Sequence, residues 1–325
     1  MPGHDVVVIG SYVQDHIWTL PAFPRAGETA PADGYASCAG GKGFNQAVAA
    51  HRLGARVRFV GALGDDAGAD GARAFAAAEG LAASWQTVAG QPTAAAGILV
   101  DGAGNNLIAV ALGANRKLAP SFIAGLADEL AGSRLLLTQM ETSLAAVAAV
   151  ADLADALAIP AILNPAPMDA ALPPALLRRF PLVTPNETEF AQLLACCGVA
   201  RVDPDQVAAL PDDELQRLAR GLGVATVVVT LGRHGCFVCH AGGSPWAAGE
   251  PACYRLAAEA VASIDSTGAG DCFNGALAAA LAAGAGTGFR AAIVDANRAA
   301  ALSTERRGTT VAMPTRTEVA ARFGA

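Results

Sequence analysis

Basic residues are scarce in this chain of 325 residues, which has 22 Lys and Arg against 29 Asp and Glu and a formal charge of −7. No run of five or more basic residues occurs in it. A surface that binds nucleic acid needs clustered Lys and Arg, so the sequence argues against nucleic acid as a partner. Only 16% of the residues are charged and 53% are hydrophobic, which also argues against a disordered chain.

Long uninterrupted hydrophobic segments are absent as well. No apolar stretch reaches the ~20 residues that span a bilayer without Gly, Pro or charge interrupting it. The opening residues, MPGHDVVVIGS, lack the basic region and the small-residue cleavage site of a secretory signal. The sequence therefore predicts no membrane partner and a cytoplasmic location. The length suits one large core, so a single domain over residues 1–325 is expected.

The seven cysteines do not have the spacing of a disulfide framework. Residues 236–240 read Cys-Phe-Val-Cys-His, which matches the C-x-x-C-H motif of c-type haem attachment. Haem attachment requires an exported protein, and the same residues also read as a strand. In a strand, Cys236 and Val238 would face one side while Phe237 and Cys239 face the other. The strand is the favoured interpretation.

Short β-branched runs alternate with longer Ala- and Leu-rich helical patterns, which predicts a doubly wound α/β fold with a mostly parallel sheet flanked by helices. The predicted strands are Val6–Ile9, Val57–Val60, Leu135–Thr138, Ala161–Leu163, Leu182–Thr184 and Val227–Thr230. The predicted helices are Asn45–Leu53, Ala67–Glu79, Ser121–Leu130, Ser143–Leu157, Glu187–Cys196, Asp213–Leu222, Gly270–Ala283, Gly288–Ser303 and Thr315–Phe323.

Two stretches do not follow this alternation. Residues 12–36 and 93–112 have strand-like patterns with no helix between the strands. A small β-sheet that stands off the main body would account for both. Such a sheet is a candidate lid, and lids exclude water from clefts in which phosphoryl groups are transferred.

The strongest local motif is Asp-Ser-Thr-Gly-Ala-Gly-Asp at 265–271, directly before a helical pattern. The small residues Gly268, Ala269 and Gly270 allow backbone N–H groups to converge on an anion at the start of a helix. A carboxylate beside that anion, Asp271, is well placed to take the proton from an attacking hydroxyl. The alternative is an N-cap, which explains one Asp but not the small residues before it.

A second glycine-rich motif, Gly-Gly-Lys-Gly-Phe-Asn at 40–45, also precedes a helix. It is not a Walker A loop, because Lys42 is followed by Gly43 and not by Ser or Thr. Close approach at Gly41, with Lys42 and Asn45 as donors, suits a polyhydroxylated ligand. The alternative is a tight turn with Lys42 in solvent.

Three other strand ends carry polar residues or glycines at the edge where open α/β sheets bind ligands. Asn186 and Glu189 are three residues apart, so both could position a hydrated Mg²⁺, although a capping box explains them equally well. A glycine turn follows Thr230, with Gly232 and Gly235 where a nucleotide phosphate could lie. Glu141 follows another strand as a single carboxylate.

Together these motifs resemble the ribokinase-like, or pfkB-type, carbohydrate kinases over nearly the whole chain. The resemblance rests on Gly-Gly-Lys-Gly-x-Asn-Gln-Ala-Val-Ala at 40–49, Asn-Pro-Ala-Pro at 164–167, Thr-Pro-Asn-Glu-Thr-Glu at 184–189 and Asp-x-Thr-Gly-Ala-Gly-Asp at 265–271. It implies transfer of the γ-phosphoryl group of ATP to a primary hydroxyl of a pentose-like sugar, with Mg²⁺ and K⁺ as cofactors. It also implies pairing of two subunits through the lid.

The resemblance further implies a role for each matching position. Asp271 matches the catalytic base, and the amides of residues 268–270 match an anion hole for the transferring group. The positions that match the sugar site are Asp15, Gly41, Lys42, Asn45 and Glu141. Those that match the ATP site are Asn186, Thr230, Gly232, Gly235 and Asn297, with Asn186 and Glu189 near Mg²⁺. A monovalent-cation loop is matched by Asp265, Thr267, Ser303, Arg306 and Gly308.

One position departs from the family pattern. Val13 stands where ribokinases usually place Asn, and strand alternation puts it on the same face as Asp15. Val cannot form a hydrogen bond to a sugar hydroxyl, so the preferred sugar is expected to differ from ribose at one hydroxyl or to carry an apolar group there.

Three other functions are alternatives to the sugar kinase. A nucleoside kinase of the same family would need an apolar wall for a base, for which Tyr12, Val13 and Phe44 are candidates. An NAD-dependent oxidoreductase is disfavoured, because the first strand is not followed by G-x-G-x-x-G. A catalytically inactive sugar-binding regulator is disfavoured by the presence of Asp271.

Overall fold

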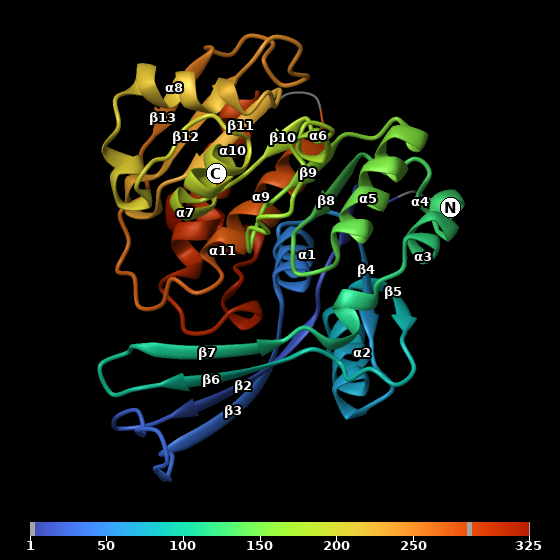
Figure 1. Cartoon of the computed structure of the whole chain (residues 1–325), viewed down its shortest axis with the longest axis vertical. Helices are drawn as coiled ribbons and strands as arrows, with labels where there is room; N and C mark the ends of the chain where they lie inside the picture. Colours follow the sequence, from blue (N-terminus) through green and yellow to red (C-terminus); the bar gives the residue numbers. More distant parts are fainter. Residues whose placement is uncertain (1–3, 285–287, 325) are drawn as a thin grey trace.

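Two β-sheets organise the protein in the computed structural model, which describes residues 4–284 and 288–324 (Figure 1). The larger sheet has nine strands, and the smaller sheet has four. In spatial order, the larger sheet contains β13 (Cys253–Leu256), β12 (Cys236–His240), β11 (Thr226–Thr230), β10 (Leu182–Val183), β9 (Ala161–Leu163), β8 (Leu135–Thr138), β1 (Val6–Ile9), β4 (Val57–Leu63) and β5 (Ala82–Thr87). The smaller sheet contains β3 (Gly34–Gly40), β2 (Val13–Thr19), β6 (Ala95–Val100) and β7 (Asn106–Ala111).

Seven neighbouring strands of the larger sheet are parallel to one another: β5, β4, β1, β8, β9, β10 and β11. At the other edge, β12 pairs antiparallel with β11, and β13 pairs antiparallel with β12. The apolar runs that predicted strands are buried on both faces; Val6, Val7 and Val8 have no exposed surface. Since the parallel strands share one direction, the residues after β1, β8, β9, β10 and β11 all emerge at the same edge of the sheet. The predicted doubly wound fold is confirmed.

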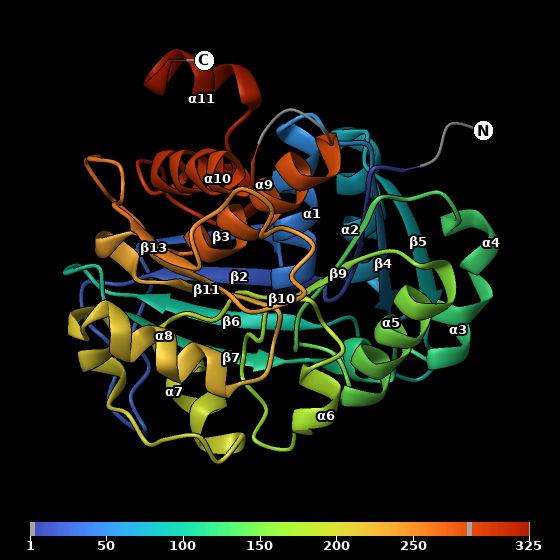
Figure 2. The ribbon, with the colours of Figure 1, turned by 90° about the horizontal axis from the view of Figure 1, so that it is seen from above.

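Helices cover both faces of the larger sheet, and the two layers are seen from above in Figure 2. One face is covered by α1 (Lys42–Arg52), α2 (Ala67–Glu79), α9 (Ala269–Ala283) and α10 (Phe289–Ser303), with α11 (Arg316–Phe323) outside them. The other face is covered by α3 (Pro120–Gly125), α4 (Ala127–Leu130), α5 (Leu144–Leu157), α6 (Pro174–Leu177), α7 (Glu187–Cys196) and α8 (Asp212–Gly221). Short 3₁₀ turns lie at η1 (Gly113–Lys117), η2 (Pro204–Ala209), η3 (Gly232–His234) and η4 (Thr310–Ala312).

Within the segments that the structure describes, no helix is long and apolar enough to cross a bilayer.

The Cys-x-x-Cys-His motif forms β12, as the strand interpretation predicted. Cys236 and Val238 belong to the core on the α1 and α9 side, whereas Phe237 and Cys239 belong to the core on the α5 and α7 side. The cysteines of the motif therefore point to opposite faces of the sheet and cannot attach to the same haem.

The smaller sheet projects from one side of the main body (Figure 1). Its four strands come from the two stretches that the sequence set apart, 12–36 and 93–112, with β3 extending to Gly40. All six residues of its edge strand β7 are exposed, among them Leu107 at 54% and Ile108 at 50%. A long, exposed and apolar edge strand is unusual in a protein that stays alone in solution.

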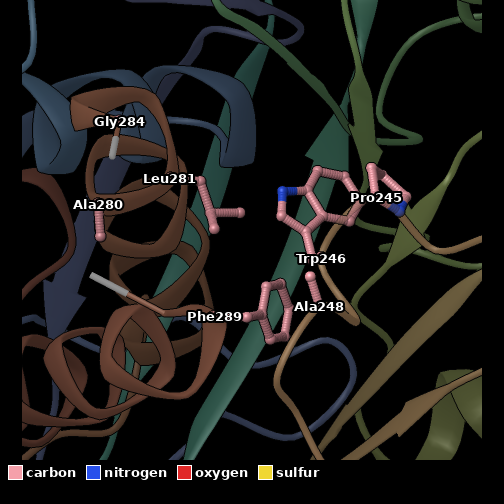
Figure 3. A pocket seen from close by; sticks show the side chains of 7 residues that line it. All are labelled: Pro245, Trp246, Ala248, Ala280, Leu281, Gly284 and Phe289. Atoms are coloured by element: carbon pink, nitrogen blue, oxygen red, sulfur yellow. The ribbon is translucent and has the colours of Figure 1, made fainter. Parts of the chain in front are cut away.

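A pocket of about 350 Å³ lies at the C-terminal end of α9 (Figure 3). Pro245, Trp246 and Ala248 of the loop between β12 and β13 face Leu281 of α9 and Phe289 of α10 across it. The sequence motif with Asp271 is at the other end of α9, and a helix of 15 residues is about 22 Å long. This pocket is therefore separate from the candidate active site.

Candidate active site

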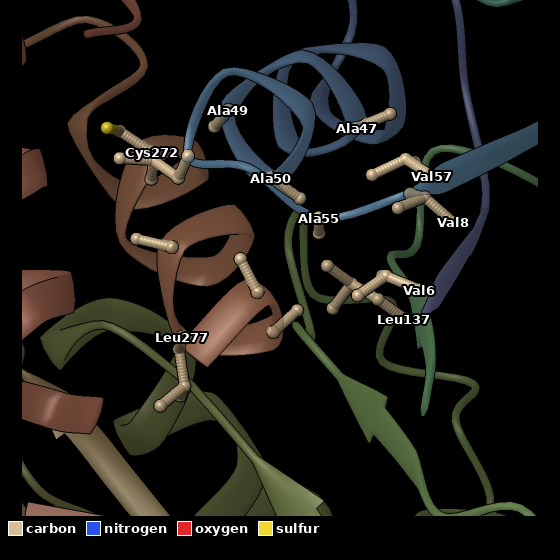
Figure 4. Close-up of a cluster of buried hydrophobic side chains, with 14 of the residues drawn as sticks. Val6, Val8, Ala47, Ala49, Ala50, Ala55, Val57, Leu137, Cys272 and Leu277 are labelled. Atoms are coloured by element: carbon tan, nitrogen blue, oxygen red, sulfur yellow. The ribbon is translucent and has the colours of Figure 1, made fainter. Parts of the chain in front are cut away.

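The packing of α1 against α9 brings two sequence motifs together, as seen in the core around Cys272 and Ala49 (Figure 4). A Cβ on Gly275 of α9 would lie 2.4 Å from the carbonyl oxygen of Gln46 and 2.6 Å from Ala49 Cβ. Only a residue without a side chain permits this approach. As a result, Asn45 and Gln46 in the first turns of α1 lie directly beside Asp271 in the first turn of α9.

The N-terminus of α9 has the features of an anion site. Gly268 is the N-cap with a φ of 79°, a left-handed conformation that favours glycine. The first N–H groups of a helix have no partner within it. The Ala269 N–H donates to the Ser266 carbonyl at 3.2 Å, so among the described residues the N–H groups of Gly270 and Asp271 are the ones left to a ligand. A side chain on Gly270 would point into open space, since no atom lies within 4 Å of its Cβ position. The backbone here can therefore approach an anion closely.

Asp271 is 6% exposed, and both of its carboxylate oxygens are hydrogen-bonded. Asn45 Nδ2 donates to Oδ2 at 2.9 Å, and Gln46 Nε2 donates to Oδ1 at 3.0 Å. The Thr310 hydroxyl lies within hydrogen-bonding distance of both Asn45 Oδ1, at 2.8 Å, and the Ala39 carbonyl oxygen, at 2.5 Å. Each carboxylate oxygen keeps a further acceptor position, so Asp271 can still receive a proton.

Gln46 connects Asp271 to two strand ends of the sheet, a role that the sequence did not predict. The same Nε2 also donates to Asn164 Oδ1 after β9 at 3.0 Å, and Gln139 Nε2 after β8 donates to Gln46 Oε1 at 2.6 Å. Asn164 in turn donates to the Thr184 carbonyl oxygen after β10. Gln46 is fully buried and its amide forms three hydrogen bonds, so its orientation is fixed.

Replacing Gln46 with Leu is expected to lower kcat more than it raises KM, because Asp271 loses a donor that orients it. A hydrogen bond to a charged group contributes about 1.5–3 kcal/mol, which corresponds to a decrease of roughly 10- to 150-fold. Steady-state kinetics and thermal unfolding should be measured together, with the exposed Gln206→Leu as the control. A change in KM alone in a folded variant would contradict this positioning role.

Asp15, Glu141 and Lys42 converge next to Asp271 from the smaller sheet, from β8 and from α1. Glu141 Oε2 accepts hydrogen bonds from the Ser11 hydroxyl at 2.5 Å and the Lys42 backbone N–H at 2.9 Å. Burial acts to lower the pKa of Lys42, but the carboxylates of Asp271, Glu141 and Glu189 outweigh it and the pKa is raised. Lys42 therefore stays charged among these carboxylates and is not free in solvent.

Burial raises the pKa of Asp15 to about 7, and the carboxylates of Glu141 and Asp271 add to the effect. The folded protein thus holds this proton up to about pH 7, whereas the unfolded chain releases it near pH ~4. Since the folded pKa is the higher one, ionisation of Asp15 costs stability progressively as the pH rises from about 4 to about 7.

The variant Asp15→Asn removes that cost. The difference in melting temperature between variant and wild type is therefore expected to grow in the variant's favour from pH ~4 to ~7 and to stay constant above that range. Thermal unfolding in the absence of ligand measures this, with the exposed Asp70→Asn of α2 as the control. Parallel melting curves for Asp15→Asn and wild type over the whole range would show that Asp15 titrates normally.

Asn186 and Glu189 form a capping box at the start of α7, one of the two roles that their spacing predicts. Asn186 Oδ1 accepts from the Glu189 N–H at 2.9 Å, and Glu189 Oε2 accepts from the Asn186 N–H at 2.9 Å. Glu189 is nevertheless only 8% exposed and acts electrostatically on Lys42, so its carboxylate lies on the site's side of α7. In the described part of the chain no three His, Cys, Asp or Glu residues gather as direct metal ligands. The lone pairs that the capping box leaves free on Asn186 Oδ1 and the Glu189 carboxylate are oxygen acceptors for the waters of a hydrated Mg²⁺.

The predicted nucleotide residues line the adjacent strand end. Thr230 ends β11 and pairs with Asn186 through an isolated bridge, and η3 with Gly232 follows at once. Gly235 has a φ of 83° and reverses the chain into β12. Asn297 of α10 reaches the other side of β12, where its Nδ2 donates to Cys236 Sγ at 3.8 Å. Thr230, Gly232 and Gly235 therefore lie next to the Asn186 cap, whereas Asn297 contacts β12.

The loop before α9 is organised by Asp265. Its Oδ1 accepts from the Thr267 N–H at 2.9 Å and its Oδ2 from the Gly308 N–H at 3.0 Å. Two of the positions matched to the cation loop use their side chains elsewhere: Ser303 Oγ donates to the Ala300 carbonyl, and Arg306 pairs with Glu318 at 2.7 Å. The Ser303 and Arg306 side chains are therefore not free to act as ligands of a cation in this loop.

Two of the three side chains proposed as a wall for a nucleoside base are in the core. Tyr12 and Phe44 are at most 1% exposed and stack edge-to-face at 5.2 Å between ring centroids. Both also contact Trp85. Val13 is buried too, at 3% exposed, in a small separate cluster with Ala94 and Ala96 on the Asp15 face of β2.

The chain is similar to known proteins over nearly its whole length. Residues 4–316 match the model of the pfkB family carbohydrate kinase. A ribokinase of Haemophilus influenzae is 36% identical over 314 residues, which cover 96% of each chain, and a deoxyribokinase of Salmonella typhi is 30% identical over 84% of each chain. The structure of an Arabidopsis thaliana ribokinase complexed with ribose and ATP has a TM-score of 0.81 and 28% identity, and the match covers 98% of this chain and 97% of that one. From the family match over nearly its whole length, this chain is a member of the pfkB family of carbohydrate kinases, which are phosphotransferases.

Proposed function

We propose that this protein transfers the γ-phosphoryl group of ATP to a primary hydroxyl of a pentose-like sugar, ribose or a close analogue, with Asp271 as the general base. The observation that carries the proposal is the buried Asp271 carboxylate, fixed by Asn45 and Gln46, in the first turn of α9. A proton acceptor and an anion site are thereby held within one helical turn of each other.

In this reaction the sugar lies between the smaller sheet and the C-terminal edge of the larger sheet. Asp15, Lys42, Asn45 and Glu141 bind its hydroxyls, and the remaining acceptor position of Asp271 takes the proton of the attacking hydroxyl. The amides at residues 268–270 donate to the oxygens of the phosphoryl group as it moves. The smaller sheet acts as a lid that excludes water from the transfer.

The nucleotide extends from the start of α9 across Asn186, Thr230, Gly232 and Gly235 towards Asn297. Asn186 and Glu189 would hold a hydrated Mg²⁺, which would supply positive charge to the phosphates. The backbone around Asp265, Thr267, Ser303, Arg306 and Gly308 would hold K⁺. Ordering that loop would also support Gly268, because Asp265 binds the backbone N–H of Thr267, directly before Gly268, and that of Gly308.

The exposed edge strand β7 supports a homodimer that pairs through the lid. Ile108 and Val110 are 50% and 48% exposed and share one face of β7. Replacing both with Glu is expected to convert a dimer into a monomer in sedimentation velocity, while Ala175→Glu on the surface of α6 leaves the dimer intact. A wild-type monomer, or a variant that still dimerises, would contradict pairing through β7.

The test of the function is ADP release from Mg²⁺-ATP with a panel of pentoses, hexoses and nucleosides, with and without K⁺. Sugar-dependent turnover that K⁺ raises is the expected result. Preferential turnover of nucleosides would identify a nucleoside kinase of the same family. If a folded protein binds a sugar but shows no turnover with any acceptor, the sugar-binding regulator replaces the kinase.

A further inference from the structure

Two cysteines outside the active site lie directly opposite each other on neighbouring strands. Cys239 of β12 and Cys253 of the edge strand β13 are paired in the antiparallel register. We propose that these two cysteines form a reversible disulfide under mild oxidation by a peroxide, and that the β12–β13 hairpin is thus a thiol-modification site of this protein. The proposal does not depend on the identity of the sugar or on the activity.

The hydrogen-bond pattern makes the pair suitable for such a bond. The His240 N–H donates to the carbonyl oxygen of Ala252, just before β13, at 2.8 Å. The next N–H, that of Ala241, donates in the other direction, to the carbonyl oxygen of Ala225 just before β11. Backbone groups along β12 therefore alternate between its two neighbours, and Cys239 and Cys253 form a non-hydrogen-bonded pair. Cα atoms in such pairs are about 4.5 Å apart, within the ~4.4–6.8 Å range of disulfides.

The side chains point to the same face of the sheet, as opposite residues in an antiparallel pair must. Cys239 belongs to the core on the α5 and α7 side, and Cys253 packs against that core. Cys236, the other cysteine of β12, faces the opposite core and is opposite Leu256. Of the two cysteines of β12, Cys239 is therefore the one placed to bond with Cys253, and Cys236 provides a matched control.

The exposure of the two thiols sets the order of the reaction. Cys253 is partly exposed, whereas Cys239 is 2% exposed, and burial raises the pKa of the Cys239 thiol to about 11. The Cys253 thiolate attacks the peroxide, the O–O bond breaks, and a sulfenic acid and hydroxide form. The Cys239 sulfur then displaces water from that sulfenic acid. In sum, two thiols lose two electrons and two protons, and the peroxide becomes two waters; a dithiol reductant reverses the reaction.

The bond would close the loop between the two strands at its base. This loop carries Pro245, Trp246 and Ala248, one wall of the pocket at the end of α9 (Figure 3). Linking both ends of a loop reduces the conformations open to the unfolded chain, so the oxidised protein is expected to melt at a higher temperature. The edge strand β13 also becomes covalently tied to the sheet.

Peptide mapping of the folded wild-type protein, after treatment with hydrogen peroxide and alkylation of the remaining thiols, tests the proposal. Chymotrypsin cleaves after Phe237 and Trp246, which puts Cys236, Cys239 and Cys253 on three separate peptides. The expected product is a linked pair of the peptides that carry Cys239 and Cys253, which dithiothreitol separates. Cys239→Ser or Cys253→Ser should abolish it and also the increase in melting temperature, whereas Cys236→Ser should preserve both.

The same map without peroxide gives the reduced reference, and a sample oxidised in urea shows which links arise from unfolded chains. Because the mapping uses the wild type, the proposal remains testable if a serine variant does not fold. Alkylation of both cysteines after peroxide treatment, their conversion to sulfinic acid without a link, or a link through Cys236 would each overturn it.

Discussion

Replacing Asp271 with Asn is expected to lower kcat for sugar-dependent ADP release by about 10²–10⁴-fold, the usual contribution of a general base. Asn has nearly the same shape but cannot accept a proton, so KM for the sugar and for ATP should change little. Asp271 is buried and already receives donors from Asn45 and Gln46. Initial rates over a range of sugar and ATP concentrations measure both parameters.

The matched control for this variant is Asp70→Asn, since Asp70 is an exposed carboxylate in the first turn of another helix, α2. Its kinetics should equal those of the wild type. Binding of ATP to Asp271→Asn, followed by calorimetry, distinguishes lost chemistry from a lost site. If folded Asp271→Asn keeps kcat within a few-fold of the wild type, another group removes the proton and the assignment of the base is wrong.

The regular elements of the larger sheet could be predicted because their signals are local. Leu135–Thr138 and Ala161–Leu163 are short apolar runs buried on both faces. The helices Ala67–Glu79 and Glu187–Cys196 begin directly after the N-cap residues Asp66 and Asn186. The edge strand β5 was missed, because its residues are only partly buried and form no apolar run.

Interruptions of regular structure were harder to predict. The helix expected over Ser121–Leu130 is in fact two short helices, α3 and α4, with a break at Leu126 where ψ is 1°. Gly125 precedes this break and has weak helix propensity, but propensity alone does not say whether a helix bends or stops. That outcome depends on how each half packs under the sheet.

The site was predicted unevenly for a similar reason. Asp271 and the glycines before it have a local signature, because an anion site at a helix start needs small residues. Gln46 and Asn164 have no such signature, since a buried amide is recognised only by its partners. Those partners, Gln139 and Asp271, are far away in the sequence. Gln46 and Asn164 stood within motifs of the family, but their position in the polar network follows only from the fold.

Val13 is the residue of the proposed sugar site that departs from the family pattern, because it stands where ribokinases usually place Asn. It is 3% exposed, packs against Ala94 and Ala96, and shares a face of β2 with Asp15. A hydroxyl bound against Val13 would lose its hydrogen bond to water without gaining another, at a cost of about 1–3 kcal/mol. We therefore expect the wild-type protein to prefer a pentose that lacks one hydroxyl of ribose, or that carries an apolar group there, over ribose itself.

Replacing Val13 with Asn is expected to shift the ratio of kcat/KM values towards ribose by roughly 5- to 150-fold, since the amide can bond to the extra hydroxyl. Initial rates with ribose and with its deoxy analogues, measured for each protein, give this ratio. Val13→Ala is the control, because it enlarges the site without adding a polar group and should favour neither sugar. If ribose is the best acceptor of the wild type, with a KM in the usual micromolar to millimolar range, Val13 does not select against a hydroxyl and specificity resides in Asp15, Asn45 and Glu141 instead.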